Sequence, residues 1–520
     1  MRDSRQTTGG TLFLLALIVL VGAYLRVVNL RTAPGWYPDE GSDLNIALNL
    51  AQGRFQYFAV DGTLLVAARA PLYHLICAAL FEIFGYDILV ARAVAAFAGL
   101  MTIPLLFFVF KNSLGRWQAL AIAACFAIFP SAVLYNRWAF AYNLLMPFFT
   151  LFFWALLRLI ETRRARWLLL AASVTALAIL TTWVAVALVI CLGVTGWFYQ
   201  RRGLLWSLPL ALSLPILFLI VSYLAAPASF MQDFALTFSR TESSLLAQFV
   251  MASFNYTVFL GSNAWMIPSI IGLFLIEPRR VRALVLLIFF TMLFFVLRFS
   301  VIADLGFYRV LGLVPFMALG IVALLWRAVP RLAQIIAADA EILFARWTWL
   351  SQRTRIIRIS KLLGVSIFIW LAIVDALFFA GVTVFLRTPI AAPTPIDAVL
   401  AVPLPDALAA IDFVNARARP EDVIIASPQI GWALRGRVAD FQQTLSYQGF
   451  PTDNYPTPLE PARFVFDPTP ANARYAVVDP MWEIWATEKI TATTQLLNAV
   501  AQWDVAFRAG HFTVYRNPAR

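Results

Sequence analysis

The chain has 520 residues, of which 61% are hydrophobic and 13% are charged, and its mean hydropathy is +0.79. Soluble globular proteins average about 45–50% apolar and about 25% charged residues, so soluble cores cannot hide this much apolar surface. The composition excludes a string of soluble domains, a disordered protein and a fibrous repeat. It predicts a polytopic α-helical membrane protein.

The net charge of +12 comes from 40 Lys+Arg against 28 Asp+Glu. A nucleic-acid-binding surface gathers its basic residues into one patch, whereas here they recur in short clusters between apolar runs. Such clusters are typical of the cytoplasmic loops of membrane proteins. We therefore expect a multi-pass protein of the cell membrane, surrounded by lipids and without a nucleic acid partner.

Membrane-spanning helices are predicted wherever a run of about 20 residues is largely apolar. Residues 1–387 then form a transmembrane domain of about 11–13 helices, the count depending on how adjoining runs are divided. A short apolar run at 71–84 is interpreted as a re-entrant or interfacial helix, and 328–360 as an interfacial cytoplasmic helix. The predicted spans are 11–30, 91–110, 117–134, 140–159, 167–182, 183–199, 204–224, 263–276, 281–299, 308–327 and 361–387.

The basic clusters also predict the orientation. If the amino terminus is cytoplasmic, the clusters at 111–116, 163–166, 201–202, 279–282 and 327–361 all fall on the cytoplasmic side. The same arrangement puts a first loop, residues 31–70, outside the cytoplasm. Everything after Arg387 is then extracytoplasmic too.

The composition changes after the last predicted span. Residues 388–405 are rich in proline and predict a linker, and 406–520 predict a small soluble extracytoplasmic α/β domain. Helical spacing occurs at 406–416. Short apolar runs typical of buried strands occur at 423–426, 475–478 and 512–515.

The first outside loop carries the most specific pattern. After the pair Asp39-Glu40, apolar residues at 44, 47, 48 and 51 recur at i, i+3, i+4 and i+7, which predicts an amphipathic helix lying on the membrane surface. Asp39 or Glu40 would stand near its N-terminus, where unpaired N–H groups favour a carboxylate. Asp39 is then either a simple helix cap or a reactive group.

Arginines in other outside segments favour the reactive alternative. A carboxylate at the membrane face can take the proton of an attacking hydroxyl, while guanidinium groups hold a departing lipid phosphate. Arg69, Arg137 and Arg309, the last directly after Tyr308, are placed to do this. Each arginine could instead extend its charge from the apolar layer to the interface, as many membrane arginines do.

These residues carry a family resemblance. The run Trp36 to Glu40, then Arg69 to Tyr73, then Arg92 at the next apolar run, and later Tyr308 to Pro315, resembles membrane glycosyltransferases of the GT-C fold. The likeness is to the protein O-mannosyltransferases and the lipid A aminoarabinose transferases, and covers most of residues 1–330. The resemblance implies that Asp39 is a general base supported by Glu40. It also implies a donor phosphate near Arg69 and Arg137.

One departure from the aminoarabinose enzymes concerns metals. Where they have a second acidic residue in a later outside turn, this chain reads Ala141-Tyr142-Asn143. Sites for Mg²⁺ or Mn²⁺ are built mainly from carboxylate oxygens, so a metal-independent reaction without a cofactor is expected. Tyr142, Trp138 and His74 are weaker candidates for contacts to a sugar or an acceptor, since each could equally be a packed or interfacial residue.

The sequence thus predicts transfer of a monosaccharide from a polyprenyl-phosphate donor to a hydroxyl on a protein, glycolipid or polysaccharide. A direct displacement needs a base and a leaving-group clamp but no enzymic nucleophile, so the anomeric centre should invert. Two alternatives stay open: a transporter or flippase of an anionic lipid-linked sugar, and a non-catalytic assembly partner. Transporters often place ionisable residues near the bilayer midplane, whereas the charges here lie at one face.

Overall fold

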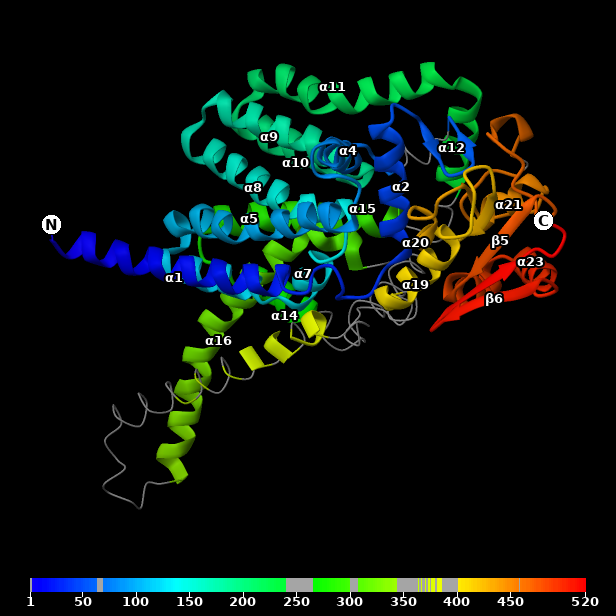
Figure 1. The fold of residues 1–520 in the computed structure, drawn as a ribbon. Coiled ribbons are helices and arrows are strands. Elements are labelled where there is room, and N and C mark those ends of the chain that lie inside the picture. Colours follow the sequence, from blue (N-terminus) through cyan, green and yellow to red (C-terminus); the bar gives the residue numbers. More distant parts are fainter. Residues whose placement is uncertain are drawn as a thin grey trace.

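The computed structural model describes residues 2–62, 69–239, 265–299, 307–343, 401–457 and 459–520, with scattered positions between 363 and 385. A bundle of long helices is followed by a C-terminal α/β domain (Figure 1). The amino terminus lies at one end of the bundle and this domain at the other. The prediction of a polytopic helical protein with a small C-terminal α/β domain is confirmed.

Helices occupy the described part of every predicted span. Six described segments are long and apolar enough to cross a membrane. These are Gly9–Val27, Ile88–Leu114, Ala141–Thr162, Arg201–Ala225, Arg279–Arg298 and Tyr308–Ala328. The bundle elements are α1 (Arg2–Val27), α5 (Ile88–Leu114), α6 (Arg116–Ala127), α7 (Pro130–Tyr135), η1 (Ala141–Leu144), α8 (Leu145–Thr162), α9 (Ala165–Ile179), η2 (Trp183–Val186), α10 (Ala187–Tyr199), α11 (Arg201–Ala225), α12 (Pro227–Ser239), α14 (Met266–Phe274), α15 (Arg279–Phe299), η5 (Phe307–Leu313) and α16 (Val314–Leu343).

Two predicted helices differ from the structure for identifiable reasons. The span 117–134 is divided into α6 and α7, because Phe129 takes an extended conformation (ψ 118°) before Pro130, as the ring of a following proline favours. In contrast, α16 continues through Pro330 as one helix to Leu343. The predicted span 308–327 matches the apolar segment Tyr308–Ala328, and the start of the predicted interfacial helix continues it without a break. Residues 344–360 lie outside the described part.

Three short elements occupy the end of the bundle that faces the C-terminal domain. They are α2 (Pro38–Ala51), a hairpin of β1 (Gln56–Tyr57) and β2 (Val60–Asp61), and α4 (Leu72–Phe84). Figure 1 views α4 along its axis while α5 and α8 run across the picture, so α4 does not follow the spanning helices. This orientation agrees with the interfacial interpretation of 71–84.

The prediction of a surface-lying helix after Asp39-Glu40 is only half right. The helix exists as α2, but ten of its residues are buried, including polar Ser42 and Asn45. Its predicted polar face does not meet water because α20 (Pro428–Gly431) of the C-terminal domain covers it, while α4 packs against it from the bundle. Helical spacing located the helix, but the element that covers it lies almost 400 residues further along the chain.

The C-terminal domain is built on a five-stranded mixed sheet of order β4-β3-β5-β7-β6. The first three of these strands are parallel, and β7 is antiparallel to both its neighbours. Val402, in the predicted linker, pairs with Trp36 of the first loop. The elements of the domain are α19 (Leu404–Asn415), β3 (Val423–Ala426), α20 (Pro428–Gly431), β4 (Arg437–Asp440), α21 (Phe441–Tyr447), η6 (Pro461–Arg463), β5 (Ala473–Val478), η7 (Met481–Ala486), α22 (Thr487–Lys489), α23 (Ala492–Val500), β6 (Asp504–Ala509) and β7 (Phe512–Arg516).

Candidate active site

The first turn of α2 carries the Asp-Glu pair. Pro38 takes the first helical position, where its missing N–H matters little because that group has no partner inside a helix. Before it, Tyr37 is extended and its backbone N–H donates to the Glu40 carboxylate at 3.2 Å. Glu40, at the third helical position, therefore makes the capping contact with the backbone of Tyr37.

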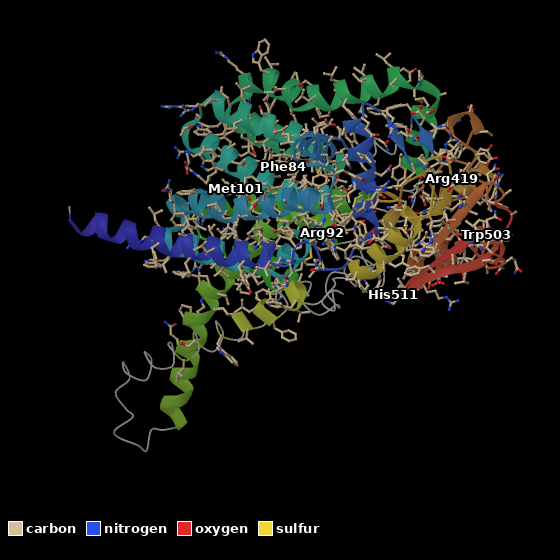
Figure 2. The ribbon with its side chains drawn as sticks, in the orientation of Figure 1. Phe84, Arg92, Met101, Arg419, Trp503 and His511 are labelled. Carbon is tan, nitrogen blue, oxygen red and sulfur yellow. The ribbon has the colours of Figure 1, made fainter. Side chains whose placement is uncertain are left out.

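Glu40 is also half of a buried ion pair. Arg92, in the first turns of α5, donates through Nε to Oε1 at 2.8 Å and through Nη2 to Oε2 at 2.7 Å, and both side chains are 0% exposed. The same carboxylate accepts from the backbone N–H of Ala139 at 2.8 Å. Figure 2 marks Arg92 where α5 begins, at the end of the bundle that faces the C-terminal domain. Glu40 thus ties three segments together, and no part of it faces solvent.

Asp39 has a different environment. Its side chain is 35% exposed, and its Oδ1 accepts from Nη2 of Arg69 at 3.0 Å. Arg69 donates through Nη1 to Asp43 at 2.9 Å, one helical turn further along α2. The Asp43 carboxylate, 7% exposed, also lies 3.0 Å from Nε2 of the buried His74 in α4. Asp39 is therefore the carboxylate of this group that a substrate can reach.

The charges in the group compensate one another. Burial by itself would raise the pKa of Asp43, but the interactions with Arg69 and His74 outweigh it and lower the pKa below its usual value. Burial works in the opposite sense on Arg69, yet Asp39 and Asp43 raise its pKa well above the ordinary value. Arg69 therefore stays charged, and Asp43 stays ionised as its counter-ion.

Arg137 and Trp138 lie beneath the loop that leads to α2. Arg137 is 0% exposed, and its guanidinium donates to the carbonyl oxygens of Leu25, Val28 and Ala33 at 2.6–3.1 Å. The indole Nε1 of Trp138 donates to the carbonyl of Gly35 at 2.9 Å. In this structure both side chains hold the loop. Neither is presented to a ligand, although the sequence led us to expect contacts to a phosphate for Arg137 and to a sugar or acceptor for Trp138.

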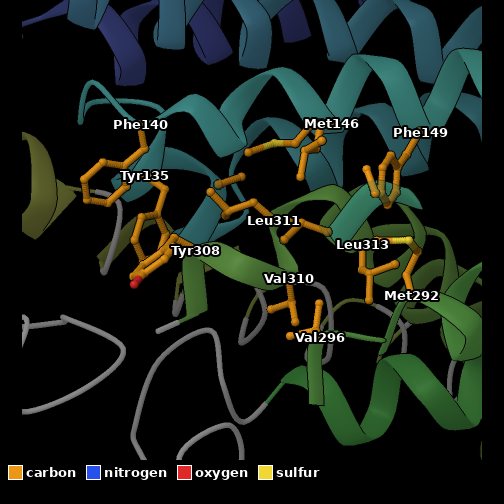
Figure 3. Close-up of a cluster of buried hydrophobic side chains, with 14 of the residues drawn as sticks. Tyr135, Phe140, Met146, Phe149, Met292, Val296, Tyr308, Val310, Leu311 and Leu313 are labelled. Atoms are coloured by element: carbon orange, nitrogen blue, oxygen red, sulfur yellow. The ribbon is translucent and has the colours of Figure 1, made fainter. Parts of the chain in front are cut away.

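Tyr308 and Arg309 of η5 form a neighbouring group with Tyr142 of η1. The rings of Tyr142 and Tyr308 lie 5.0 Å apart, and the Arg309 guanidinium lies 5.6 Å from the Tyr308 ring. Figure 3 shows Tyr308 beside Tyr135 and Phe140, to the left of the apolar side chains around Leu311. Phe140 contacts both Tyr308 (5.5 Å) and Tyr37 (5.3 Å), so a chain of rings connects this group to the residue that precedes α2.

Two contributors to the site, Arg92 and Asp43, were not assigned a role from the sequence. Arg92 was noticed but given no role, although an arginine inside an apolar helix is costly unless it is paired. Asp43 was likewise not connected to His74 and Arg69. The connection of Asp43 to the site could have been found from its helical spacing to Asp39, which places both carboxylates on one face of α2.

The described residues line several cavities. One of about 320 Å³ lies at the open end of the β1–β2 hairpin, lined by Phe55, Asp61, Ser229, Arg463 and their neighbours. Another of about 660 Å³ lies between α1, α6 and α16 and is lined almost entirely by apolar side chains. Asp39 lines neither of the two. Within the described residues, no group of three His, Cys, Asp or Glu side chains is arranged to hold a metal ion.

Comparisons with known proteins give the same fold. A family model described as dolichyl-phosphate-mannose-protein mannosyltransferase matches residues 68–225. ArnT from Cupriavidus metallidurans, solved with undecaprenyl phosphate, superposes with a TM-score of 0.62 at 16% identity and covers 98% of each chain. Its apo form gives 0.63 at 16% identity and covers 99% of each chain.

An archaeal oligosaccharyltransferase is similar over the same length. AglB from Archaeoglobus fulgidus, solved with an inhibitory peptide and a dolichol-phosphate, gives a TM-score of 0.57 at 11% identity. The match covers 96% of this chain and 72% of that one. A comparison with curated protein sequences found no match.

This chain has the GT-C glycosyltransferase fold. The resemblance to membrane glycosyltransferases of the GT-C fold is confirmed, by the family model over residues 68–225 and by the superposition along almost the whole chain. The fold and the apolar helices also confirm a multi-pass membrane protein.

Proposed function

We propose that the chain transfers a monosaccharide from a polyprenyl-phosphate donor to a hydroxyl acceptor, with Asp39 as the general base. One observation carries this proposal: on the first turns of α2, Asp39 is 35% exposed whereas Asp43 is 7% and Glu40 is 0% exposed. A general base must reach the proton that it abstracts, and only Asp39 of these three carboxylates is open to a substrate. The acceptor is a protein, a glycolipid or a polysaccharide.

The proposed step is a single displacement. The acceptor oxygen bonds to the anomeric carbon as its proton passes to the Asp39 carboxylate, and the bond from that carbon to the phosphate oxygen breaks. The lipid phosphate leaves with the electron pair, so the anomeric centre inverts. Arg69 keeps its charge beside the base and is proposed to face the phosphate, together with Arg309. Arg137 is not included, because its N–H groups are already bonded to backbone carbonyls.

The proposal needs no divalent metal. The carboxylates of the site already have cationic partners in the chain itself, since Arg69 contacts Asp39 and Asp43 while Arg92 contacts Glu40. A metal ion would compete with these arginines for the same oxygens. We propose that guanidinium groups supply the positive charge that a metal supplies in other phosphate sites.

The reaction is proposed to take place outside the cytoplasm. The basic loops of the bundle favour a cytoplasmic amino terminus. The site lies at the other end of the bundle, next to the C-terminal domain (Figure 1). A lipid-linked donor suits this side, where nucleotide sugars are not expected.

The test compares Asp39→Asn with Glu82→Gln in full-length protein in detergent. Glu82 is an exposed carboxylate of α4 and serves as the matched control. Transfer of label is followed from polyprenyl-phosphate mannose and polyprenyl-phosphate aminoarabinose to acceptors in membranes from cells lacking the protein. We expect Asp39→Asn to lower kcat about 10²–10⁴-fold, the usual contribution of a general base, while Glu82→Gln stays within twofold.

Two outcomes contradict the proposal. Full activity of Asp39→Asn ends the assignment of the base. Absence of transfer by the unaltered protein from either donor favours a transporter or flippase of a lipid-linked sugar, which movement of the labelled donor across vesicles would then detect. Absence of both activities leaves the assembly-partner interpretation.

A further inference from the structure

The carboxyl edge of the C-terminal sheet is where an open α/β sheet usually binds a ligand. Three parallel strands end there, and each ends in, or is directly followed by, a buried polar residue. Ser427 follows β3, Asp440 ends β4 and Asp479 follows β5, and none is more than 1% exposed. Ser427 donates to the Asp479 carboxylate. This edge faces the chain's own first loop.

A close backbone approach joins α2 to α20. A Cβ added to Gly41 would overlap the carbonyl group of Pro428, so the two backbones touch without an intervening side chain. Next to it, Nε2 of Gln429 donates to the carbonyl of Trp36. Gly41 lies two positions after Asp39 in the same helical turn. In Figure 1, α2 lies between the bundle and α20.

A second contact runs through Gln443. This side chain is 0% exposed, and it donates through Nε2 to the carbonyl of Tyr57 at 2.7 Å and accepts at Oε1 from the N–H of Ala59 at 3.0 Å. The β1–β2 hairpin, which Gln443 contacts in this way, is itself hydrogen-bonded to α2. The Tyr57 hydroxyl lies 2.8 Å from Oγ of Ser42, and the N–H of Phe58 donates to Asn45 at 3.0 Å.

We propose that the C-terminal domain is a positioning element for Asp39. Its carboxyl edge, instead of holding a diffusible ligand, holds the helix that presents the base and thereby sets where the carboxylate stands. Gly41 and Gln443 are the positioning residues, one through direct backbone contact and the other through the hairpin. This inference rests on the proposed function only in treating Asp39 as a base, because the contacts between the C-terminal domain and α2 do not depend on that role.

Gly41→Ala is the sharpest probe, with Gly193→Ala as its control. Both glycines are helical, but an added Cβ meets nothing within 4 Å at Gly193. A displacement of about 1 Å in a reacting group can cost about 100-fold in rate. We expect Gly41→Ala to lower kcat by this order with donor and acceptor KM within twofold, and Gly193→Ala to change neither. Equal kcat in both variants overturns the proposal, as does a raised acceptor KM at unchanged kcat, which would indicate a ligand site at that edge.

Substitutions at Gln443 remove its contacts to the hairpin one at a time. Gln443→Glu keeps the acceptor for the Ala59 N–H and loses the donor to Tyr57, whereas Gln443→Ala loses both. We expect kcat to fall in that order while purified protein elutes as a single folded species. If Gln443→Ala retains the kcat of the unaltered chain, Gln443 has no positioning role.

A readout without catalysis separates this proposal from the proposed function. In a background where Cys77, Cys125 and Cys191 are replaced by alanine, Asp39→Cys is labelled with a water-soluble maleimide. We expect the labelling rate to change when Gly41→Ala is added and to stay the same when Gly193→Ala is added. Equal rates overturn the positioning role even if Asp39→Asn abolishes transfer. Unequal rates support it even if no donor is used.

Discussion

Glu40 and Arg92 form an ion pair in which neither side chain touches solvent. Removing one partner of such a pair leaves a buried charge uncompensated, at a cost of about 3–5 kcal/mol. We expect Glu40→Gln to lower the midpoint of thermal unfolding in detergent far more than Glu161→Gln. Glu161 pairs with Arg158 on the surface, where a pair contributes about 0–1 kcal/mol. Similar shifts in the two variants would contradict the structural role given to Glu40.

The sequence located one member of this residue group better than the others. Asp39 could be singled out because an Asp-Glu pair opens a helical pattern in an outside loop. Arg92 could not, because its partner lies 52 residues away and nothing local marks which carboxylate an arginine in an apolar run contacts. Arg137 was misplaced for a related reason. Its neighbours along the chain do not show that the carbonyls of Leu25, Val28 and Ala33 surround it.

Among the elements, α2 differs most from what its periodicity indicates. A helix on a membrane surface would expose the side opposite residues 44, 47, 48 and 51, yet Ile46 on that side is 0% exposed. A core isoleucine truncated to alanine costs about 2–5 kcal/mol, whereas an exposed site changes stability by about 0.5 kcal/mol or less. We expect Ile46→Ala to destabilise the protein strongly and Leu408→Ala, at a 41% exposed position, hardly at all. The midpoint of thermal unfolding in detergent measures both effects. Small shifts in both variants would indicate that this side of α2 is exposed.

The strands show the same limit of local patterns. The runs 423–426, 475–478 and 512–515 match β3, β5 and β7, because buried strands are almost continuously apolar. The edge strands β4 and β6 were missed. They contain charged residues such as Arg437, Asp440 and Asp504, which an edge position tolerates but a pattern of apolar residues does not reveal.

For the whole molecule, the sequence predicted two parts but not how they meet. Composition and periodicity act over tens of residues, and they separated the bundle from the α/β domain. The contact between Trp36 and Gln429 spans 393 positions, so no local signal announces it. Two buried carboxyls, Asp440 and Asp479, lie at the edge of the C-terminal sheet that packs against α2. Their ionisation tests whether this contact excludes water.

Burial raises the pKa of Asp440 and of Asp479 to about 7 in each case, although hydrogen bonds from Gln442 and Ser427 oppose it. The ordinary value is 3.8, so between about pH 4 and pH 7 the folded protein holds protons that the unfolded chain has released. The free energy of unfolding contributed by these groups therefore falls as the pH rises through that window. At 1.36 kcal/mol per pKa unit, one carboxyl accounts for at most about 3 kcal/mol between pH 5 and pH 8.

Asp440→Asn removes one of these titrations and leaves an uncharged side chain of the same shape. The stability of this variant relative to the unaltered protein should therefore increase from pH 5 to pH 8, whatever constant offset the lost hydrogen bonds introduce. Asp504→Asn, at a 58% exposed carboxylate of β6, should show no such trend. Unfolding midpoints of the full-length chain in detergent across this range give the answer. A difference that stays flat or decreases with pH would mean that the carboxyl edge is open to water, and the domain would then not be sealed onto the helix that carries Asp39.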